Sequence, residues 1–581
     1  MSSIPSQYRT KLAVLVRYLY PDADTEALCA AVTGAFWPDG HTMRQRSRVP
    51  NNSLWSEEDA LMIAYGDSII DGAHKPLDLL QDFLKRRLSG IVSGIHILPF
   101  FPFTSDDGFA VTDYRKVNGI LGDWADINRI AGEFTVMSDL VLNHVSSQGN
   151  WFNEYLQGHQ PYDRFFFEAS PEDDLSAVVR PRTSPLLRPV ETANGTRHVW
   201  CTFSHDQIDL DFSNPQVLLE FLRIMRLHID NGVRIIRLDA VAFLWKVIGT
   251  NCIHLPQTHA VVRLMRLLLD YAREPVVLLT ETNVPNAENL SYFGNRNEAH
   301  AIYNFALPPL ILHALLTGTA RHLNRWQMAM PPAQLGCAYL NFTASHDGIG
   351  VRPAEGLLDD ADIDAMIGAV RHFGGMVSMR TGPDGSERPY EINTTFFDAM
   401  RGTIDGADDH QFARFLCSQT IMMALEGIPA FYIHSLLGTG NDQEGVERSG
   451  HNRAINRHRW DYPTLNRLLD DTSSPHSQVL AEMCRRIAVR RRQKAFHPNA
   501  TQFTMQLGHR IFGFWRQSLD RDQSVFALHN VSGERVILPA VSINLIGGEE
   551  WHDMLSGEVI DPSAGDILLE PYQCRWISNR W

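Results

Sequence analysis

Four apolar runs, each ending in charged or polar side chains, constrain the fold of this chain more than any other feature of its sequence. In the clearest of them, residues 233–238 are rich in β-branched side chains, Arg237 lies within the run, and Asp239 follows it. Such a run is typical of a strand buried on both faces. An ionised pair there costs roughly several kcal/mol unless its charges are matched. A purely structural Arg–Asp ion pair is therefore one interpretation of this stretch.

The same pattern recurs along the chain, which favours a functional interpretation. The other runs, with the polar residues that end them, are residues 134–142 with Asn143 and His144, residues 276–280 with Glu281, and residues 338–344 with His346 and Asp347. Polar groups at the carboxyl ends of successive strands are what an α/β barrel enzyme needs, because its active site is built on that face. The sequence therefore predicts an α/β protein with a (β/α)8 TIM barrel.

Strand and helix patterns place the barrel strands, two inserted subdomains and a C-terminal β-sandwich domain. The predicted strands are residues 61–65, 94–99, 134–142, 233–238, 276–280, 301–307, 338–344 and 428–433. The predicted divisions are an N-terminal helical extension (1–58), the first part of the barrel (59–145), an inserted subdomain after strand 3 (146–212), the middle of the barrel (213–347), a second insertion after strand 7 (348–400), the last part of the barrel (401–498) and the C-terminal β domain (499–581).

The composition limits the kinds of molecule that this protein is expected to bind. The net charge of −15 argues against nucleic acid or an anionic membrane surface, and it also fits a simple need for solubility. No apolar run approaches the ~18 residues that span a bilayer, and the N-terminal residues lack a basic region followed by an apolar core. The seven cysteines form no CxxC pair and are expected to be buried thiols. A cytoplasmic protein is expected.

Four motifs on the predicted strand ends carry a resemblance to a known family. They are Asp139-Leu-Val-Leu-Asn143-His144, Arg237-Leu-Asp239, Glu281 and His346-Asp347. In this order they resemble the signature regions of the α-amylase family of retaining α-glycosidases and transglycosidases. The resemblance covers nearly the whole chain.

Further stretches resemble the sucrose phosphorylase branch of that family, which transfers glucose reversibly between a small acceptor and inorganic phosphate. Among them are Asp106-Asp-Gly-Phe109, Arg180-Pro-Arg182 and Asn452-Arg-Ala-Ile-Asn456-Arg457. The chain departs from true sucrose phosphorylases in having Phe243 where they have Tyr, and in the segment Glu387-Arg-Pro-Tyr-Glu391. It is closer to the relatives acting on glucosylglycerate, glucosylglycerol or sucrose 6-phosphate.

The resemblance implies a double displacement by two carboxyl groups, with a third carboxylate that binds the sugar hydroxyls. Cleaving a glycosidic bond with retention requires one carboxylate to attack the anomeric carbon and a second carboxyl to protonate the leaving oxygen. Asp239 is the expected nucleophile, Glu281 the acid/base and Asp347 the third carboxylate. Arg237 is expected to keep Asp239 ionised by lowering its pKa, and the apolar run before Glu281 is expected to raise the pKa of that acid.

Other residues are expected to shape the glucose pocket. His144 and His346 would donate to sugar hydroxyls, Asp106 and Arg453 would close the far end, and Phe109 would offer an apolar face to the ring. A histidine at a strand end can equally be structural.

The acceptor side must bind phosphate, which needs cationic donors, and the arginine fork suits it. The candidates are Arg182, Arg188 and Arg388, with Tyr390 as a hydroxyl donor; Phe243 and Glu391 complete the expected acceptor pocket. The same cations could receive a glycerate carboxylate. Arg188 and Arg388 lie in polar segments, so a solvated surface charge is the competing interpretation for both.

The expected activity is therefore reversible phosphorolysis of a small α-glucoside of the glucosylglycerol or glucosylglycerate type. Alternatives are a sucrose or sucrose 6-phosphate phosphorylase, an α-glucosidase or transglucosidase using water or a sugar, and an inactive amylase-like binding subunit, which the three carboxylates disfavour. Inorganic phosphate is a co-substrate. No cofactor is expected, and no metal, because no loop shows calcium-ligand spacing. The sequence leaves a homodimer open.

Overall fold

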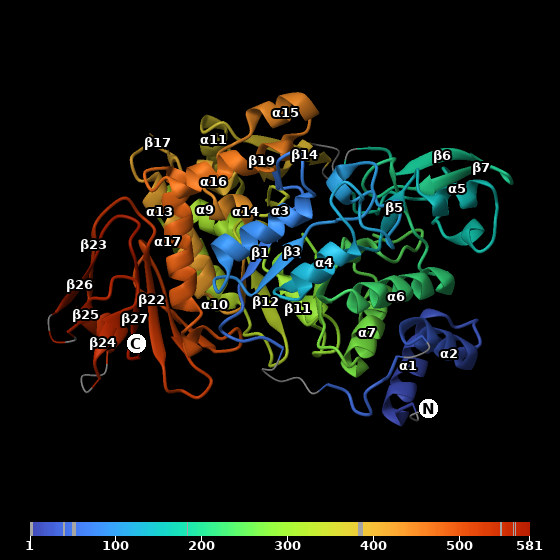
Figure 1. Cartoon of the computed structure of the whole chain (residues 1–581), viewed down its shortest axis with the longest axis horizontal. Coiled ribbons are helices and arrows are strands. Elements are labelled where there is room, and N and C mark those ends of the chain that lie inside the picture. Colours follow the sequence, from blue (N-terminus) through green and yellow to red (C-terminus); the bar gives the residue numbers. More distant parts are fainter. Residues whose placement is uncertain are drawn as a thin grey trace.

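The computed structural model is an α/β barrel with additions at both ends of the chain (Figure 1). It describes residues 4–38, 41–48, 54–182, 184–381, 387–545, 549–561, 563 and 565–580. No helix among these residues is both long and apolar enough to cross a bilayer.

Eight parallel strands close into a barrel, and each lies within or overlaps a predicted segment. They are β1 (Leu61–Ala64), β3 (Gly94–Ile97), β4 (Thr135–Val141), β9 (Val233–Asp239), β10 (Val277–Thr280), β11 (Ala301–Tyr303), β12 (Ala338–Asn341) and β18 (Ile428–Tyr432). The strand order follows the chain, and β18 closes the barrel on β1 with Ala430 opposite Leu61. The predicted (β/α)8 barrel is confirmed.

Helices cover the outside of the barrel (Figure 1). They are α3 (Pro76–Phe83), α4 (Trp124–Ala131), α6 (Pro215–Asp230), α7 (Pro256–Tyr271), α9 (Leu307–Thr317), α10 (Arg321–Ala329), α13 (Gln411–Ala424) and α17 (Pro475–Arg490). At the start of α6, the Asn214 side chain accepts the Gln216 N–H at 3.0 Å, and Pro215 occupies the first turn. Both residues favour a helix start, so the local sequence explains where α6 begins.

Shorter elements connect the barrel helices and strands. They are β2 (Ile69–Ile70), α8 (Asn286–Leu290), α12 (Phe396–Ala399), β16 (Gly402–Thr403), β17 (Gly406–Ala407), α14 (Ile433–Leu436), α15 (Gln443–Ser449), β19 (Trp460–Asp461) and α16 (Tyr462–Asp470).

The N-terminal segment forms two helices, α1 (Ser6–Leu19) and α2 (Thr25–Phe36). They pack against α7 and α6, respectively (Figure 1). Tyr8 of α1 is fully buried, and its ring meets that of Tyr271 edge-on with centroids 5.3 Å apart. This extension therefore enlarges the core on the outer side of the barrel helices.

The segment after β4 carries the first predicted insertion. It contains α5 (Asn150–Leu156) and the hairpin of β6 (Leu187–Thr192) with β7 (Gly195–Trp200). At its two ends, β5 (His144–Ser146) pairs antiparallel with β8 (Gln207–Asp209). This pairing holds the ends of the insertion beside the carboxyl end of β4.

The segment after β12 carries the second predicted insertion. It contains β13 (Ile349–Gly350), α11 (Asp360–His372), β14 (Met376–Thr381) and β15 (Glu387–Asn393), and its sheet has the order β13-β15-β14. The register of β14 on β15 shifts between Ser378 and Met379, so Tyr390 is an extra residue in a β-bulge. Because β13 starts two residues after Asp347, this sheet stands next to that carboxylate.

The C-terminal segment forms the predicted sheet domain. Its strands are β20 (Thr501–Met505), β21 (Ile511–Gln517), β22 (Ser524–Asn530), β23 (Val536–Pro539), β24 (Trp551–Asp553), β25 (Val559–Ile560), β26 (Asp566–Leu569) and β27 (Cys574–Ser578). Six of them form one antiparallel sheet, and β23 pairs with β26 in a second. Buried side chains of both sheets, including Phe526 and Leu569, share one core. Two sheets over one core agree with the predicted sandwich.

Candidate active site

A cavity at the carboxyl ends of the barrel strands gathers most of the predicted site residues. It is lined by Asp106, Phe109, His144, Pro181, Arg182, Phe203, Gln207, Asp239, Ala240, Ala242, Phe243, Glu281, Thr282, Asn283, Val284, His346, Asp347, Arg352, Tyr390 and Arg453. The two insertions contribute one wall each, with Arg182 from the first and Tyr390 from the second.

Arg237 lies beneath the cavity and connects two carboxylates. Its Nη1 is 2.6 Å from Asp239 Oδ1 and 2.5 Å from Asp139 Oδ1, and Asp139 also contacts His96 Nε2 at 2.7 Å. Burial opposes the charge of Asp139, but His96 and Arg237 outweigh it and hold the pKa of that carboxyl at about 2. Asp139 is thus a fixed negative charge that holds the guanidinium in place.

Glu281 stands next to Asp239 at the end of the adjacent strand. Its backbone N–H donates to the Leu238 carbonyl at 3.0 Å, and its Oε2 accepts the Ala240 N–H at 3.0 Å. Ala240 has a left-handed φ of 50°, an uncommon conformation for a residue with a Cβ. In this conformation the Ala240 N–H faces the Glu281 carboxyl.

Burial raises the pKa of both Asp239 and Glu281. The expected net lowering for Asp239 is not met, because burial outweighs the effect of Arg237 on that pKa. A negative charge on either carboxyl also disfavours ionisation of the other. The two groups therefore lose their protons one after the other. Arg237 Nη1 hydrogen-bonds Asp239 at 2.6 Å, whereas its Nη2 is 4.0 Å from Glu281 Oε2. This asymmetry favours the charge on Asp239 and the proton on Glu281, the division that a retaining glycosidase reaction needs.

Asp347 lies in a cluster of cations. Arg453 Nη1 is 2.6 Å from Asp347 Oδ1, and Arg457 Nη2 is 3.8 Å from it. Burial opposes the charge of Asp347, but these arginines outweigh it and lower the pKa of the carboxyl. Arg453 also binds both oxygens of Glu391, at 3.0 and 2.6 Å. Glu391 therefore lies behind Arg453 and positions it, rather than lining the cavity itself.

The far end of the cavity is formed by Asp106, His144 and Gln207. Gln207 Nε2 donates to Asp106 Oδ2 at 3.2 Å, and His144 Nε2 donates to the Phe109 carbonyl at 3.1 Å. Burial lowers the pKa of His144, so its imidazole is neutral near pH 7. Asp106, His144 and Gln207 all line the cavity and so lie within reach of a bound polar molecule.

Phe109 and His346 form an aromatic floor. Their rings stack with centroids 5.0 Å apart and an interplanar angle of 9°. The Arg237 guanidinium lies over the Phe109 ring at 5.8 Å. A flat apolar surface beside three carboxylates suits the apolar face of a sugar ring.

The acceptor side contains a cation held by aromatic rings. The Arg182 guanidinium lies over Tyr390 at 5.2 Å and over Phe203 at 5.9 Å, and Phe203 meets Phe243 edge-on. Among the described residues, no carboxylate lies within 4.0 Å of Arg182. Its charge is therefore available to an anionic ligand.

Two predicted acceptor residues do not reach the cavity. Arg188 lies in β6, where its Nη1 donates to the His205 carbonyl at 2.5 Å. Arg388 is exposed on β15 opposite Arg380. Arg388 and Tyr390 would share a face in a regular strand, but the bulge at Tyr390 breaks that alternation. The expectation that these arginines line the acceptor pocket is not met.

The structure adds lining residues that the sequence analysis did not single out. Arg352 follows β13 and lines the cavity, with its Nη2 3.9 Å from Glu288 Oε2. Gln207, Phe203 and Asn283 also line it. Arg352 lies five residues after Asp347, and this closeness to a predicted carboxylate is the signal that could have identified it.

Comparisons with known proteins agree with this geometry. The family model described as "Alpha amylase, catalytic domain" matches residues 80–347. Among solved structures, the sucrose 6F-phosphate phosphorylase from Thermoanaerobacter thermosaccharolyticum aligns with a TM-score of 0.72 at 24% identity, covering 89% of this chain and 98% of that chain. This likeness shows the shared fold.

Sequence relatives are closer. A glucosylglycerate phosphorylase from Spirochaeta thermophila is 43% identical over 533 residues, which cover 90% of each chain. A glucosylglycerate phosphorylase from Escherichia coli is 39% identical over 526 residues, which cover 90% of this chain and 92% of the relative. The chain therefore belongs to the α-amylase family, and within it to the glucoside phosphorylases.

Proposed function

We propose that this chain is a glucosylglycerate phosphorylase, which converts glucosylglycerate and inorganic phosphate reversibly into α-glucose 1-phosphate and glycerate. The observation that carries the proposal is the pair of arginines, Arg182 and Arg352, that line the same cavity as the three carboxylates. Both molecules that react at the anomeric carbon, glycerate and phosphate, are anions. The relatives named glucosylglycerate phosphorylase support the choice of acceptor.

The first half-reaction uses the charge division between Asp239 and Glu281. Asp239 attacks the anomeric carbon while Glu281 gives its proton to the departing glycerate oxygen, leaving a glucosyl ester on Asp239. Asp347, fixed by Arg453, hydrogen-bonds sugar hydroxyls and stabilises the positive charge that develops on the ring.

The second half-reaction uses the acceptor side. A phosphate oxygen attacks the same carbon from the side that glycerate has left, the ester bond to Asp239 breaks, and Glu281 takes up the phosphate proton. Two inversions give α-glucose 1-phosphate with retained configuration. Arg182 and Arg352 favour phosphate over water at this step because their charges bind the anion.

We propose that no cofactor takes part, since the two carboxyl groups supply the nucleophile and the proton transfers. We propose further that the enzyme acts in the cytoplasm. All seven cysteines are free thiols, as expected in a reducing compartment.

The test is phosphate release from α-glucose 1-phosphate with glycerate, glycerol, fructose or fructose 6-phosphate supplied in parallel, beside a control without acceptor. Fast release with glycerate alone supports the proposal. Preference for a neutral acceptor, or for fructose 6-phosphate, would mean that the chain is a phosphorylase with a different acceptor specificity. Release equal to the control with every acceptor would make it a hydrolase and overturn the proposal.

A further inference from the structure

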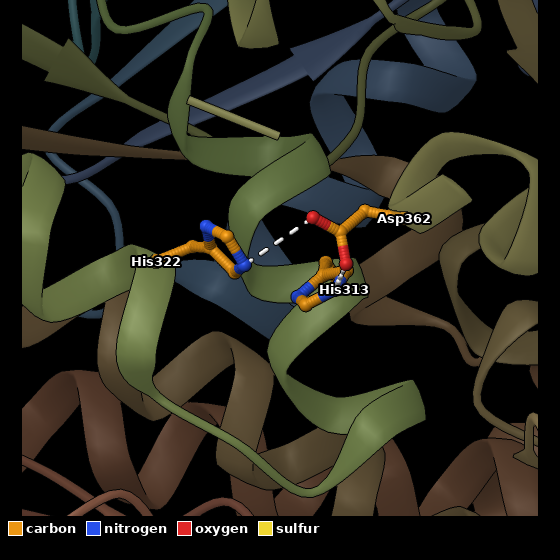
Figure 2. Close-up of side chains that lie close together, drawn as sticks. All are labelled: His313, His322 and Asp362. Carbon is orange, nitrogen blue, oxygen red and sulfur yellow. Dashed lines mark hydrogen bonds and ion pairs between the residues drawn. The ribbon is translucent and has the colours of Figure 1, made fainter. Parts of the chain in front are cut away.

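A cluster of two histidines and an aspartate lies outside the active-site cavity. His313 belongs to α9, His322 to α10 and Asp362 to the first turn of α11. Figure 2 shows both imidazole rings turned toward the carboxylate. His313 Nε2 is 3.0 Å from Asp362 Oδ1, and His322 Nε2 is 3.3 Å from Asp362 Oδ2. One nitrogen from each ring and one carboxylate oxygen all lie within 4.8 Å of one another.

The spacing of these atoms fits a tetrahedral metal ion. Zinc binds imidazole nitrogen and carboxylate oxygen at about 2.0–2.2 Å, which places neighbouring ligand atoms about 3.4 Å apart. The two imidazoles face different oxygens of Asp362, at 3.0 and 3.3 Å, and one ligand atom from each residue lies within 4.8 Å of the others, so small side-chain rotations bring the three atoms to this spacing. The two rings stand at 89° to each other with centroids 4.9 Å apart, so their Nε2 atoms converge without the rings stacking.

Hydrogen bonds to the backbone orient two of the three ligands, His322 and Asp362. His322 Nδ1 lies 2.8 Å from the Leu357 carbonyl oxygen, which can only accept, so Nδ1 carries the proton in that bond. In the neutral ring, Nε2 then presents a lone pair to Asp362 Oδ2. The same oxygen accepts the Asp359 N–H at 3.2 Å, which holds the carboxylate in place. Backbone contacts of this kind orient the ligands of metal sites.

Two lone pairs facing each other at 3.3 Å require a cation, either a second proton on His322 or a metal ion between the ligands. We propose that His313, His322 and Asp362 bind one Zn²⁺ ion, with water as the fourth ligand. Two imidazoles and one carboxylate are a donor set that suits zinc better than Ca²⁺ or Mg²⁺. The His322 side chain is 17% exposed, so solvent can reach the remaining position.

The proposed ion has a structural role. None of its three ligands lines the active-site cavity. His313 and His322 come from helices of the barrel wall, whereas Asp362 comes from the second insertion, whose sheet carries Tyr390 and Glu391. Zinc would tie this insertion to the barrel and so fix the wall that faces the acceptor.

The test is zinc content and zinc-dependent stability of the full chain. The protein is stripped with EDTA, incubated with ZnCl2, separated from free metal and analysed for zinc by mass spectrometry. We expect about one ion per chain and a thermal midpoint that rises with zinc, because an ion that binds only the folded state stabilises it. His322→Ala is expected to lose both the bound ion and the shift.

Two further variants make the result specific. His372→Ala removes an exposed histidine of the same helix α11 and is expected to retain both properties. Asp362→Asn keeps a side-chain oxygen that can accept the Asp359 N–H at the start of α11. This variant tests the zinc site if His322→Ala fails to fold. A wild-type chain that retains no zinc would show an Asp–imidazolium cluster only and overturn the proposal. Equal zinc content and an equal shift in folded His322→Ala or Asp362→Asn would also overturn it.

Discussion

The position of one guanidinium distinguishes the two reacting carboxyls. Arg237 Nη1 binds Asp239 at 2.6 Å and is itself anchored by Asp139, whereas Glu281 is reached only at 4.0 Å, by Nη2. Burial raises the pKa of both reacting groups. The pair therefore titrates at higher pH than isolated carboxyls, with the first charge on Asp239 and the last proton on Glu281.

This division predicts the pH dependence of phosphorolysis. The rate falls at low pH as Asp239 gains a proton, and it falls at high pH as Glu281 loses the proton that the leaving oxygen needs. In Glu281→Gln we expect turnover of glucosylglycerate to fall by roughly 10²–10⁴. With α-glucosyl fluoride, whose leaving group needs no acid, both proteins should lack the alkaline limb and keep the acid limb.

The measurement is kcat/KM against pH for both proteins with both donors. An alkaline limb that persists unchanged in Glu281→Gln with the fluoride would assign that titration to another group and contradict the proton placement.

Replacement of Arg182 is expected to weaken the binding of the anionic substrates selectively. A hydrogen bond to a charged group contributes about 1.5–3 kcal/mol, so Arg182→Ala should raise the KM for phosphate and for glycerate by roughly 10- to 150-fold. Steady-state kinetics in both directions measures this. Arg388→Ala is the matched control, because Arg388 is exposed and does not line the cavity. Equal effects of the two substitutions would refute the assignment.

Site residues were predictable from the sequence where they follow barrel strands. Asp239, Glu281 and Asp347 lie directly after apolar runs, so their place at one face follows from strand direction. Arg188 and Arg388 were misplaced because they lie in insertions, where side-chain direction depends on local pairing. Arg352 was missed for the same reason.

At the level of elements, the bulge between β14 and β15 determines which side chain reaches the acceptor. It makes Tyr390 an extra residue and separates its direction from that of Arg388. A bulge leaves no reliable mark in the apolar pattern of a short strand, so the sequence could not reveal it.

A separate prediction concerns how much β9, the strand that carries Asp239, contributes to the stability of the fold. Ile236 is fully buried in β9. Ile236→Ala should lower the free energy of unfolding by roughly 2–5 kcal/mol, because it removes apolar contacts and leaves a cavity. The thermal midpoint measures the direction, and Ile120→Ala, at a side chain 79% exposed, is the control. Equal midpoints for the two variants would contradict the packing described for β9.

At the level of the whole molecule, the barrel, its two interruptions and the C-terminal sheet domain follow from the sequence pattern. The positions of these parts relative to one another do not follow from that pattern. The paths of the insertions depend on contacts distant in sequence, such as the pairing of β5 with β8, which brings Gln207 beside His144. The cluster of His313, His322 and Asp362 likewise joins three helices and shows no motif spacing.

The most direct test of the account is to isolate the covalent intermediate. Glu281→Gln is treated with α-glucosyl fluoride and digested, and the peptide that contains Asp239 is analysed by mass spectrometry, with phosphate then added to the intact glucosyl-enzyme. We predict a glucosyl adduct on Asp239 and its discharge by phosphate into α-glucose 1-phosphate, which proceeds without the Glu281 base because the phosphate dianion is itself a nucleophile. An adduct on another residue, no adduct, or discharge to free glucose at the same rate with and without phosphate would contradict the account.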